Sequence, residues 1–255
     1  KAILNSDNYQ IIITDTPGIH KPKTKLSEIM INTAFESLED VDVVVFLIEA
    51  TSNEIGPGDK KIIEKLKSIG KKCILAINKT DLAEKEKLLN LMKIYSEEYD
   101  FKSIVPISAT NGKGIDDLLN EIIKLLPEGP MYYDKEEYTD QTTRQMVEEI
   151  IREKALMYLQ DEVPHGLYVE VDKFKTGKTM KNEKIFNIEA TIYTVKESHK
   201  GIIIGKGGNM LKRISTSARY DIEKMLEEKV NLKVWVKIKE DWQQKDNIIK
   251  KFKIK

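Results

Sequence analysis

The sequence predicts two domains, an open doubly wound α/β domain with a mostly parallel sheet and a smaller α+β domain behind it. Short apolar runs alternate with helix-period segments up to residue 126, and a helix-breaking segment follows at 127–130. The charge also changes sign along the chain. Residues 1–172 hold 21 Lys and Arg against 32 Asp and Glu, whereas residues 173–255 hold 21 against 10.

The first domain is predicted from continuously apolar runs, which are typical of parallel strands buried on both faces. The chain opens on a hairpin, strand–polar turn–strand, within residues 2–13. Buried parallel strands are expected at 10–13, 41–48, 73–77 and 104–107, and helices at 26–38, 58–69, 84–99 and 114–126. Because residue 1 is Lys and the chain opens inside a hairpin, we expect further sequence upstream.

The second domain is predicted to start after a tyrosine- and acid-rich linker. The prolines at 127–130 end the preceding helix, so we place the first domain at 1–130, the linker at 131–140 and the second domain at 141–255. Within the second domain we expect a helix at 142–160, strands at 166–174 and 185–195, a basic loop at 175–184, a glycine-rich turn at 205–208, a long helix at 209–228 and a last strand at 232–239.

Composition limits the class of protein. No apolar run approaches the roughly 20 residues of a membrane span. The single cysteine, Cys73, lies in an apolar run, so we expect a buried thiol and no intrachain disulfide, which fits a reducing cytoplasm. The basic C-terminal third indicates an anionic partner, although a solvated lysine-rich surface would have the same composition.

Two motifs follow predicted strands at the sheet edge where open α/β domains bind ligands. Asp15 in the segment 15–18 (Asp-Thr-Pro-Gly) can hold Mg²⁺ through water, and the N–H of Gly18 can approach a terminal phosphate. In the segment 78–81 (Asn-Lys-Thr-Asp), the Asp81 carboxylate can accept two hydrogen bonds from the N1–H and N2–H₂ edge of guanine, a donor pair that adenine lacks. The stem of Lys79 can lie along the base.

A third motif, Ser-Ala-Thr at 108–110, follows the last predicted strand. Here the N–H of Ala109 can reach guanine O6, and Ser108 can brace Asp81. Each motif alone also describes an ordinary turn. Their order, with 63 residues from Asp15 to Asn78 and 27 from Asp81 to Ser108, predicts a guanine-nucleotide site that takes GTP or GDP with Mg²⁺.

The phosphate-binding loop G-x-x-x-x-G-K-[ST] does not occur in these residues. We therefore expect a sheet without its innermost strand and a site without the cradle for the α- and β-phosphates. Ile19 stands where Ras-like proteins place a water-orienting Gln, and an apolar side chain cannot orient water. His20 is a candidate for that catalytic role, although a loop histidine is more often merely solvated.

A glycine-rich turn, Gly205-Lys206-Gly207-Gly208, marks the second candidate site. Glycines let the backbone approach phosphates, and the N–H groups of the following helix add positive potential. The order of two strands, this turn, a long helix and a strand is that of the type II KH fold, which binds RNA. Further candidate RNA-binding residues near this turn are Lys200, Lys212, Arg213 and Arg219.

Taken together, the motifs closely resemble those of the Era family of bacterial ribosome-assembly GTPases. The resemblance covers all 255 residues and is carried by the segments 15–20, 78–81, 108–110, 149–154, 162–165, 201–209 and 232–237. It implies a GTPase that binds the 3′ end of small-subunit ribosomal RNA and assists assembly of the small subunit. It also implies a cytoplasmic monomer with some peripheral association with the inner membrane.

An alternative function stays open at this stage. The family pattern has an upstream segment with the first strand and the phosphate-binding loop, and without it catalysis by these residues is an open question. The chain could then be an RNA-binding module whose nucleotide domain is inactive and serves as an interaction surface.

Overall fold

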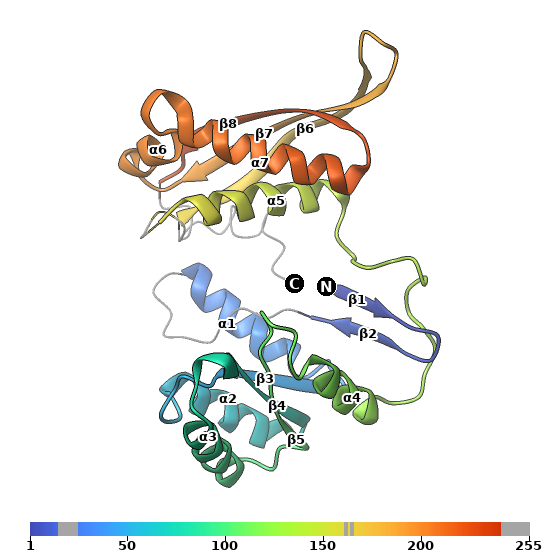
Figure 1. Cartoon of the computed structure of the whole chain (residues 1–255), viewed down its shortest axis with the longest axis vertical. Helices are drawn as coiled ribbons and strands as arrows, with labels where there is room; N and C mark the ends of the chain where they lie inside the picture. Colours follow the sequence, from blue (N-terminus) through green and yellow to red (C-terminus); the bar gives the residue numbers. More distant parts are fainter. Residues whose placement is uncertain (15–24, 161–162, 164–165, 241–255) are drawn as a thin grey trace. The chain divides into compact units, whose positions relative to one another are not determined.

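The computed structural model describes residues 1–14, 25–160, 163 and 166–240, and the chain divides into two compact units between Thr139 and Asp140 (Figure 1). The part before this point is called unit 1 and the part after it unit 2. Among the described helices, none has both the length and the apolar character that a membrane span needs.

Unit 1 contains the predicted doubly wound sheet. Its strands β3 (Val43–Glu49), β4 (Lys72–Asn78) and β5 (Ser103–Pro106) pair in that order and run parallel. Helices α2 (Pro57–Ile69) and α3 (Lys85–Glu98) pack on one face, and α4 (Ile115–Leu125) packs on the other. This arrangement confirms three of the four predicted parallel strands and the two helical layers that the sequence predicts.

The central strand β4 explains the apolar runs. Five consecutive residues of β4 are buried because helices cover both faces of the sheet. Cys73 is one of them, as expected, and burial raises the pKa of its thiol to about 12. The helix α4 presents Leu118, Ile122 and Leu125 to this sheet, in agreement with its apolar periodicity.

The hairpin forms as predicted, but the pairing predicted for residues 10–13 is wrong. Strand β2 (Gln10–Ile13) pairs antiparallel with β1 (Ala2–Asn5), and within the described chain it joins no parallel sheet. A short apolar run looks the same in either kind of pairing, so the sequence could not separate them. On β3, Val45 is 39% and Leu47 56% exposed and both alternate with buried residues, so within the described chain one face of this strand is left uncovered.

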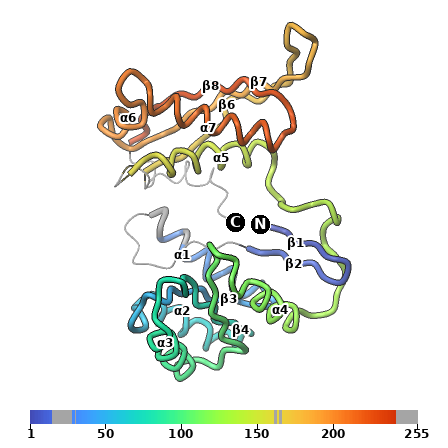
Figure 2. The backbone as a smooth tube through the Cα atoms, viewed as in Figure 1, coloured from blue at the N-terminus to red at the C-terminus, as the bar shows by residue number. Residues whose placement is uncertain are grey.

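Helix α1 (Lys25–Ser37) lies between the hairpin and β3 in the sequence, close to the range predicted for it. The segment that follows α4 was expected to be a free linker. Instead, residues 132–139 run beside the β1–β2 hairpin and bond to it (Figure 2). This segment therefore belongs to unit 1.

Unit 2 has the predicted order of a helix, two strands, a glycine-rich turn, a long helix and a strand, with one further short helix before the turn. Strands β6 (Tyr168–Lys178) and β7 (Lys184–Thr194) pair antiparallel, and β8 (Lys229–Ile238) pairs parallel with β7. The helices are α5 (Thr143–Tyr158), α6 (Glu197–Ile204) and α7 (Asn209–Leu226). This is the α+β architecture of a type II KH domain, as expected.

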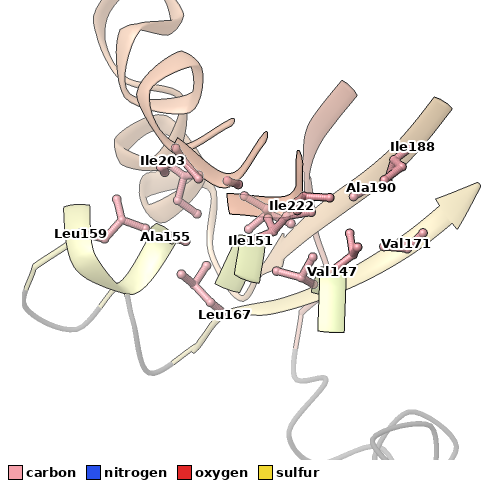
Figure 3. Packing of buried hydrophobic residues seen from close by; sticks show 14 of the residues in the cluster. Val147, Ile151, Ala155, Leu159, Leu167, Val171, Ile188, Ala190, Ile203 and Ile222 are labelled. Atoms are coloured by element: carbon pink, nitrogen blue, oxygen red, sulfur yellow. The ribbon is translucent and has the colours of Figure 1, made fainter. Parts of the chain in front are cut away.

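One apolar cluster holds unit 2 together. Val147, Ile151 and Ala155 of α5 pack with Ile188 and Ala190 of β7, all of them buried (Figure 3). The spacing of the three α5 residues places them on one side of the helix. Thr142 caps α5, since its side-chain oxygen accepts a hydrogen bond from the N–H of Gln145.

Two local predictions for unit 2 need correction. The basic loop predicted at 175–184 is shorter, because β6 continues to Lys178 and pairs there with Lys184. The short apolar segment before the glycine turn is the helix α6, of which Ile203 alone is buried. Its run of three isoleucines resembles a strand or turn in the sequence.

Candidate functional site

The nucleotide-site motif 78–81 lies at the carboxyl end of β4, where the chain turns sharply. Lys79 adopts the left-handed conformation with φ 61°, and a single 3₁₀ turn, Thr80–Leu82, follows. Thr80 fixes this turn to the end of β5, since its N–H and its hydroxyl both donate to the carbonyl of Ile107, at 3.2 and 2.8 Å. Two neighbouring parallel strands therefore hold the motif in place.

Asp81 is braced by Ser108, as the sequence predicts. The Ser108 hydroxyl donates to Asp81 Oδ1 at 2.6 Å, and Ser108 is only 1% exposed. A buried donor of this kind fixes the rotation of the carboxylate. Oδ2 of Asp81 has no hydrogen-bond partner among the described residues, and Asp81 itself is exposed. The carboxylate is thus oriented and open to a ligand that carries two adjacent N–H donors.

Asn78 connects the same two loops from the other side. Its side-chain oxygen Oδ1 accepts a hydrogen bond from the N–H of Ala109 at 3.0 Å. That N–H is the group that the sequence assigned to guanine O6. In this structure it is used to hold the 108–113 loop, which is closed by paired backbone hydrogen bonds between Ser108 and Lys113.

Lys79 has an acidic partner that the sequence did not indicate. Its Nζ lies 2.5 Å from Oε1 of Glu49, the last residue of β3, and Lys79 lowers the pKa of Glu49 by hydrogen bonding and charge. Glu49 is the register partner of Asn78 in the parallel sheet. The sequence does not reveal this register, so it could not show that Glu49 lies beside Lys79.

The loop that carries Ser108 depends on a glycine. Gly114 has φ +75°, and a Cβ atom there would lie 2.4 Å from the carbonyl oxygen of Pro106. We expect Gly114→Ala to destabilise unit 1 by about 2–4 kcal/mol, from backbone strain and the clash together. Gly112 also has a positive φ, +70°, but nothing lies within 4 Å of its Cβ position.

Gly112→Ala is therefore the matched control, with an expected loss of about 1–2 kcal/mol from the backbone alone. Urea unfolding followed by circular dichroism compares the two variants. Equal midpoints would show that the contact with Pro106 does not decide the geometry of this loop.

Three residues of the predicted nucleotide site, Asp15, Gly18 and His20, lie outside the described residues. The predicted Mg²⁺ ligand and the catalytic candidate are among them. The structure thus brings together the base-recognition half of the site, namely Asn78, Lys79, Asp81, Ser108 and Ala109.

The candidate RNA site centres on the glycine turn between α6 and α7. Gly205, Gly207 and Gly208 all have positive φ, at 72°, 61° and 78°. A Cβ atom on Gly205 would lie 2.7 Å from Cβ of Met210, so the close approach of the α7 backbone requires a glycine there. Lys206, which is exposed, lies at the tip of the turn. The turn thus places one exposed cation beside a glycine-rich backbone that a phosphate can approach closely.

The other predicted cations lie in two places. Lys200 of α6 pairs with Glu197 at 3.5 Å. On α7, the Arg213 guanidinium lies 4.2 Å over the ring of Tyr158 from α5. Lys212 and Arg213 line a hollow of about 580 Å³, together with Tyr158, Asn209, Thr216, Ser217 and Tyr220.

Arg219 has no ion pair in the described part of the chain, and the same is true of Lys206 and Lys212. These cations are consequently free to meet phosphates. The sequence did not indicate Tyr158 as part of this site, because Tyr158 lies on α5 and the predicted cations lie on α6, on α7 and in the turn between them.

The chain is similar to two protein-family models and to several known proteins. The model of the KH domain matches residues 162–243, and that of the elongation factor Tu GTP binding domain matches residues 1–128. GTPase Era of Ruminiclostridium cellulolyticum is 48% identical over 98% of this chain and 82% of its own length. GTPase Era of Thermoanaerobacter sp. is 49% identical over the same shares of the two chains.

Among solved structures, a crystal structure of Era in complex with MgGDPNP and nucleotides 1506–1542 of 16S ribosomal RNA matches with a TM-score of 0.92. It is 35% identical and covers 99% of this chain and 85% of that one. The two domain models divide the chain much as its two compact units do. From the relatives' identity and coverage it follows that this chain belongs to the GTPase Era family.

Proposed function

We propose that this protein binds GTP and GDP with Mg²⁺, hydrolyses GTP, and binds the 3′ end of small-subunit ribosomal RNA through unit 2 during assembly of that subunit. The observation that carries the nucleotide part is the braced carboxylate of Asp81, held by Ser108. Relatives named GTPase Era and the complex of Era with 16S ribosomal RNA support the reaction and the partner.

The proposed nucleotide-binding residues are Asp15, with Mg²⁺ held through water, and Gly18, Asn78, Lys79, Asp81, Ser108 and Ala109. The proposed RNA-binding residues are Lys200, Gly205, Lys206, Gly207, Gly208, Lys212, Arg213 and Arg219. His20 is proposed as a catalytic candidate. We place the nucleotide domain at 1–130, the linker at 131–140 and the KH domain at 141–255, in a protein that works as a monomer.

The Mg²⁺ ion would be held by Asp15 through water, and it would neutralise charge on the transferring phosphate. Asp81 and Ser108 select the base, whereas the cations of the glycine turn meet RNA phosphates. We also propose that the protein works in the cytoplasm with a peripheral association with the inner membrane, as the family resemblance implies. Fractionation of cells with and without a high-salt wash tests that association.

The test of the proposed function is nucleotide binding and phosphate release by the full-length protein. We expect GTP and GDP to bind and ATP to compete weakly, and we expect GTP to be hydrolysed in the presence of Mg²⁺. RNA binding without any GTP binding or turnover would favour the alternative, an RNA-binding module with an inactive nucleotide domain.

A further inference from the structure

The segment 132–139 is attached to the β1–β2 hairpin by polar contacts rather than by an apolar core. Two of its tyrosines are largely exposed, Tyr132 at 78% and Tyr138 at 62%. With so little apolar burial, hydrogen bonds must determine where this segment lies. Two amide side chains of the hairpin supply most of those bonds.

Gln10, the first residue of β2, uses all four hydrogen-bonding positions of its amide. Its Oε1 accepts from the N–H of Tyr132 at 2.8 Å and from that of Tyr133 at 3.0 Å. Its Nε2 donates to the Tyr133 carbonyl at 2.9 Å and to Asn5 Oδ1 at 2.7 Å. A fully satisfied amide of this kind holds one rotamer and one partner segment.

Asn5 continues the same network. It is the register partner of Gln10 in the hairpin. Its Nδ2 donates to the carbonyls of Glu137 at 2.7 Å and Lys135 at 3.1 Å, with the Asp134 carbonyl further away at 3.4 Å. The two amides are bonded to each other. Together they form hydrogen bonds with backbone groups of five residues between 132 and 137.

Beyond these amides the segment passes along β1 and forms one isolated β-bridge with it. The N–H of Ile3 donates to the Tyr138 carbonyl at 2.9 Å, and Ala2 and Thr139 form an antiparallel bridge. The Thr139 hydroxyl donates to the carbonyl of Lys1 at 2.9 Å. The hairpin is therefore the support on which the segment is fixed from end to end.

The two ends of this network lead to the two candidate sites. Strand β2 ends at Ile13, one residue before the motif 15–18 that is proposed to sense the terminal phosphate. At the other end, Thr142 caps α5, the first helix of the RNA-binding unit, three residues after Thr139. One residue separates β2 from the motif 15–18, and two residues separate Thr139 from Thr142.

We propose that Asn5 and Gln10 are positioning residues that couple the nucleotide state of unit 1 to RNA binding by unit 2. They do so by fastening the segment 132–139 to the hairpin. This inference rests on the proposed function. A shift of β2 on nucleotide exchange either carries the fastened segment with it or breaks its hydrogen bonds. In both cases the shift or release of the segment changes the position or the freedom of the start of α5, to which the segment is covalently joined.

The test uses full-length protein and an RNA with the 3′-end sequence of the small-subunit RNA. We measure RNA affinity with GDP and with a non-hydrolysable GTP analogue, and hydrogen exchange at the N–H groups of Tyr132 and Tyr133. In the parent we expect the two RNA affinities to differ on the order of tenfold, a typical allosteric coupling.

Asn5→Asp replaces the amide N–H₂ group, which donates to backbone carbonyls of the segment, by a carboxylate oxygen, which cannot donate. This variant should therefore release the segment. We expect fast exchange at Tyr132 and Tyr133 and nearly equal RNA affinities in the two nucleotide states, with nucleotide affinity unchanged. Gln10→Glu keeps the acceptor but loses both donated bonds, and should reduce the coupling in part. Asn8→Asp is the matched control, because Asn8 is exposed in the same turn and bonds nothing in the described chain.

Three outcomes would overturn the proposal. The parent could show equal RNA affinities with both nucleotides, Asn5→Asp could leave the segment protected, or it could release the segment and keep the parent's affinity ratio. A parent that binds RNA but no nucleotide would contradict the proposed function itself, so that failure is distinguishable. An affinity ratio lost equally in Asn8→Asp would assign the effect to charge rather than to the fastening bonds.

Discussion

Replacement of Asp81 by Asn is expected to change the preferred base from guanine to xanthine and to weaken GTP binding on the order of 10⁴-fold. In the parent, Ser108 holds one carboxylate oxygen and leaves the other free for the donor edge of guanine. The asparagine amide would instead meet the guanine amino group donor to donor. Xanthine carries a carbonyl oxygen at that position and accepts the amide N–H.

Competition titrations of the full-length protein with GTP, XTP and ATP measure this change. Asp116→Asn is a suitable control, since Asp116 is an exposed acid in the first turn of α4. GTP affinity that is the same in Asp81→Asn and the parent would contradict the assignment of the base site.

Conversion of both Lys206 and Gly207 to Asp is expected to abolish binding of single-stranded RNA and to leave GTP binding intact. The double change places two negative charges where backbone N–H groups and a cation are proposed to meet phosphates, and such juxtapositions cost several kcal/mol. Sterically the change is tolerated, because nothing lies within 4 Å of a Cβ atom on Gly207.

Because Gly207 has φ +61°, any side chain there adds some backbone strain. The neutral pair Lys206→Asn with Gly207→Asn has nearly the same shapes and the same strain without the negative charges. We expect this control to keep part of the RNA affinity in gel-shift titrations. RNA binding by the parent should also weaken with salt. The logarithm of its affinity should fall against the logarithm of the salt concentration with a slope of about 0.7 for each phosphate contacted. An acidic double variant that binds as tightly as the neutral one would contradict a phosphate-binding role.

The contacts within the proposed base-recognition half of the nucleotide site were predictable because its parts follow neighbouring strands. Asp81 and Ser108 come after β4 and β5, and parallel strands bring their carboxyl ends to one edge. Ser108 therefore meets Asp81 as the sequence indicates. Glu49 could not be found in this way, since its contact with Lys79 depends on the register between β3 and β4.

Helices and strands of the fold were predictable where burial produces a regular pattern of apolar residues in the sequence. The apolar run of β4 and the apolar spacing of α4 both reflect their packing. The pairing of β2 was not predictable, since a run of three isoleucines fits either type of sheet. The fixed position of the segment 132–139 was also missed, because amide side chains bind its backbone there, and backbone groups leave no signal in the sequence.

The bonds between the hairpin and the segment 132–139 join residues that are as many as 138 positions apart. At the usual rate of synthesis, the hairpin would wait on the order of ten seconds after its own translation for this partner. During that interval the outer edge of β1 has no partner beside it, so its unpaired backbone N–H and C=O groups are open to pairing with another chain. The nucleotide unit is therefore expected to complete its folding on the ribosome only as α5, the first helix of the RNA-binding unit, is about to emerge.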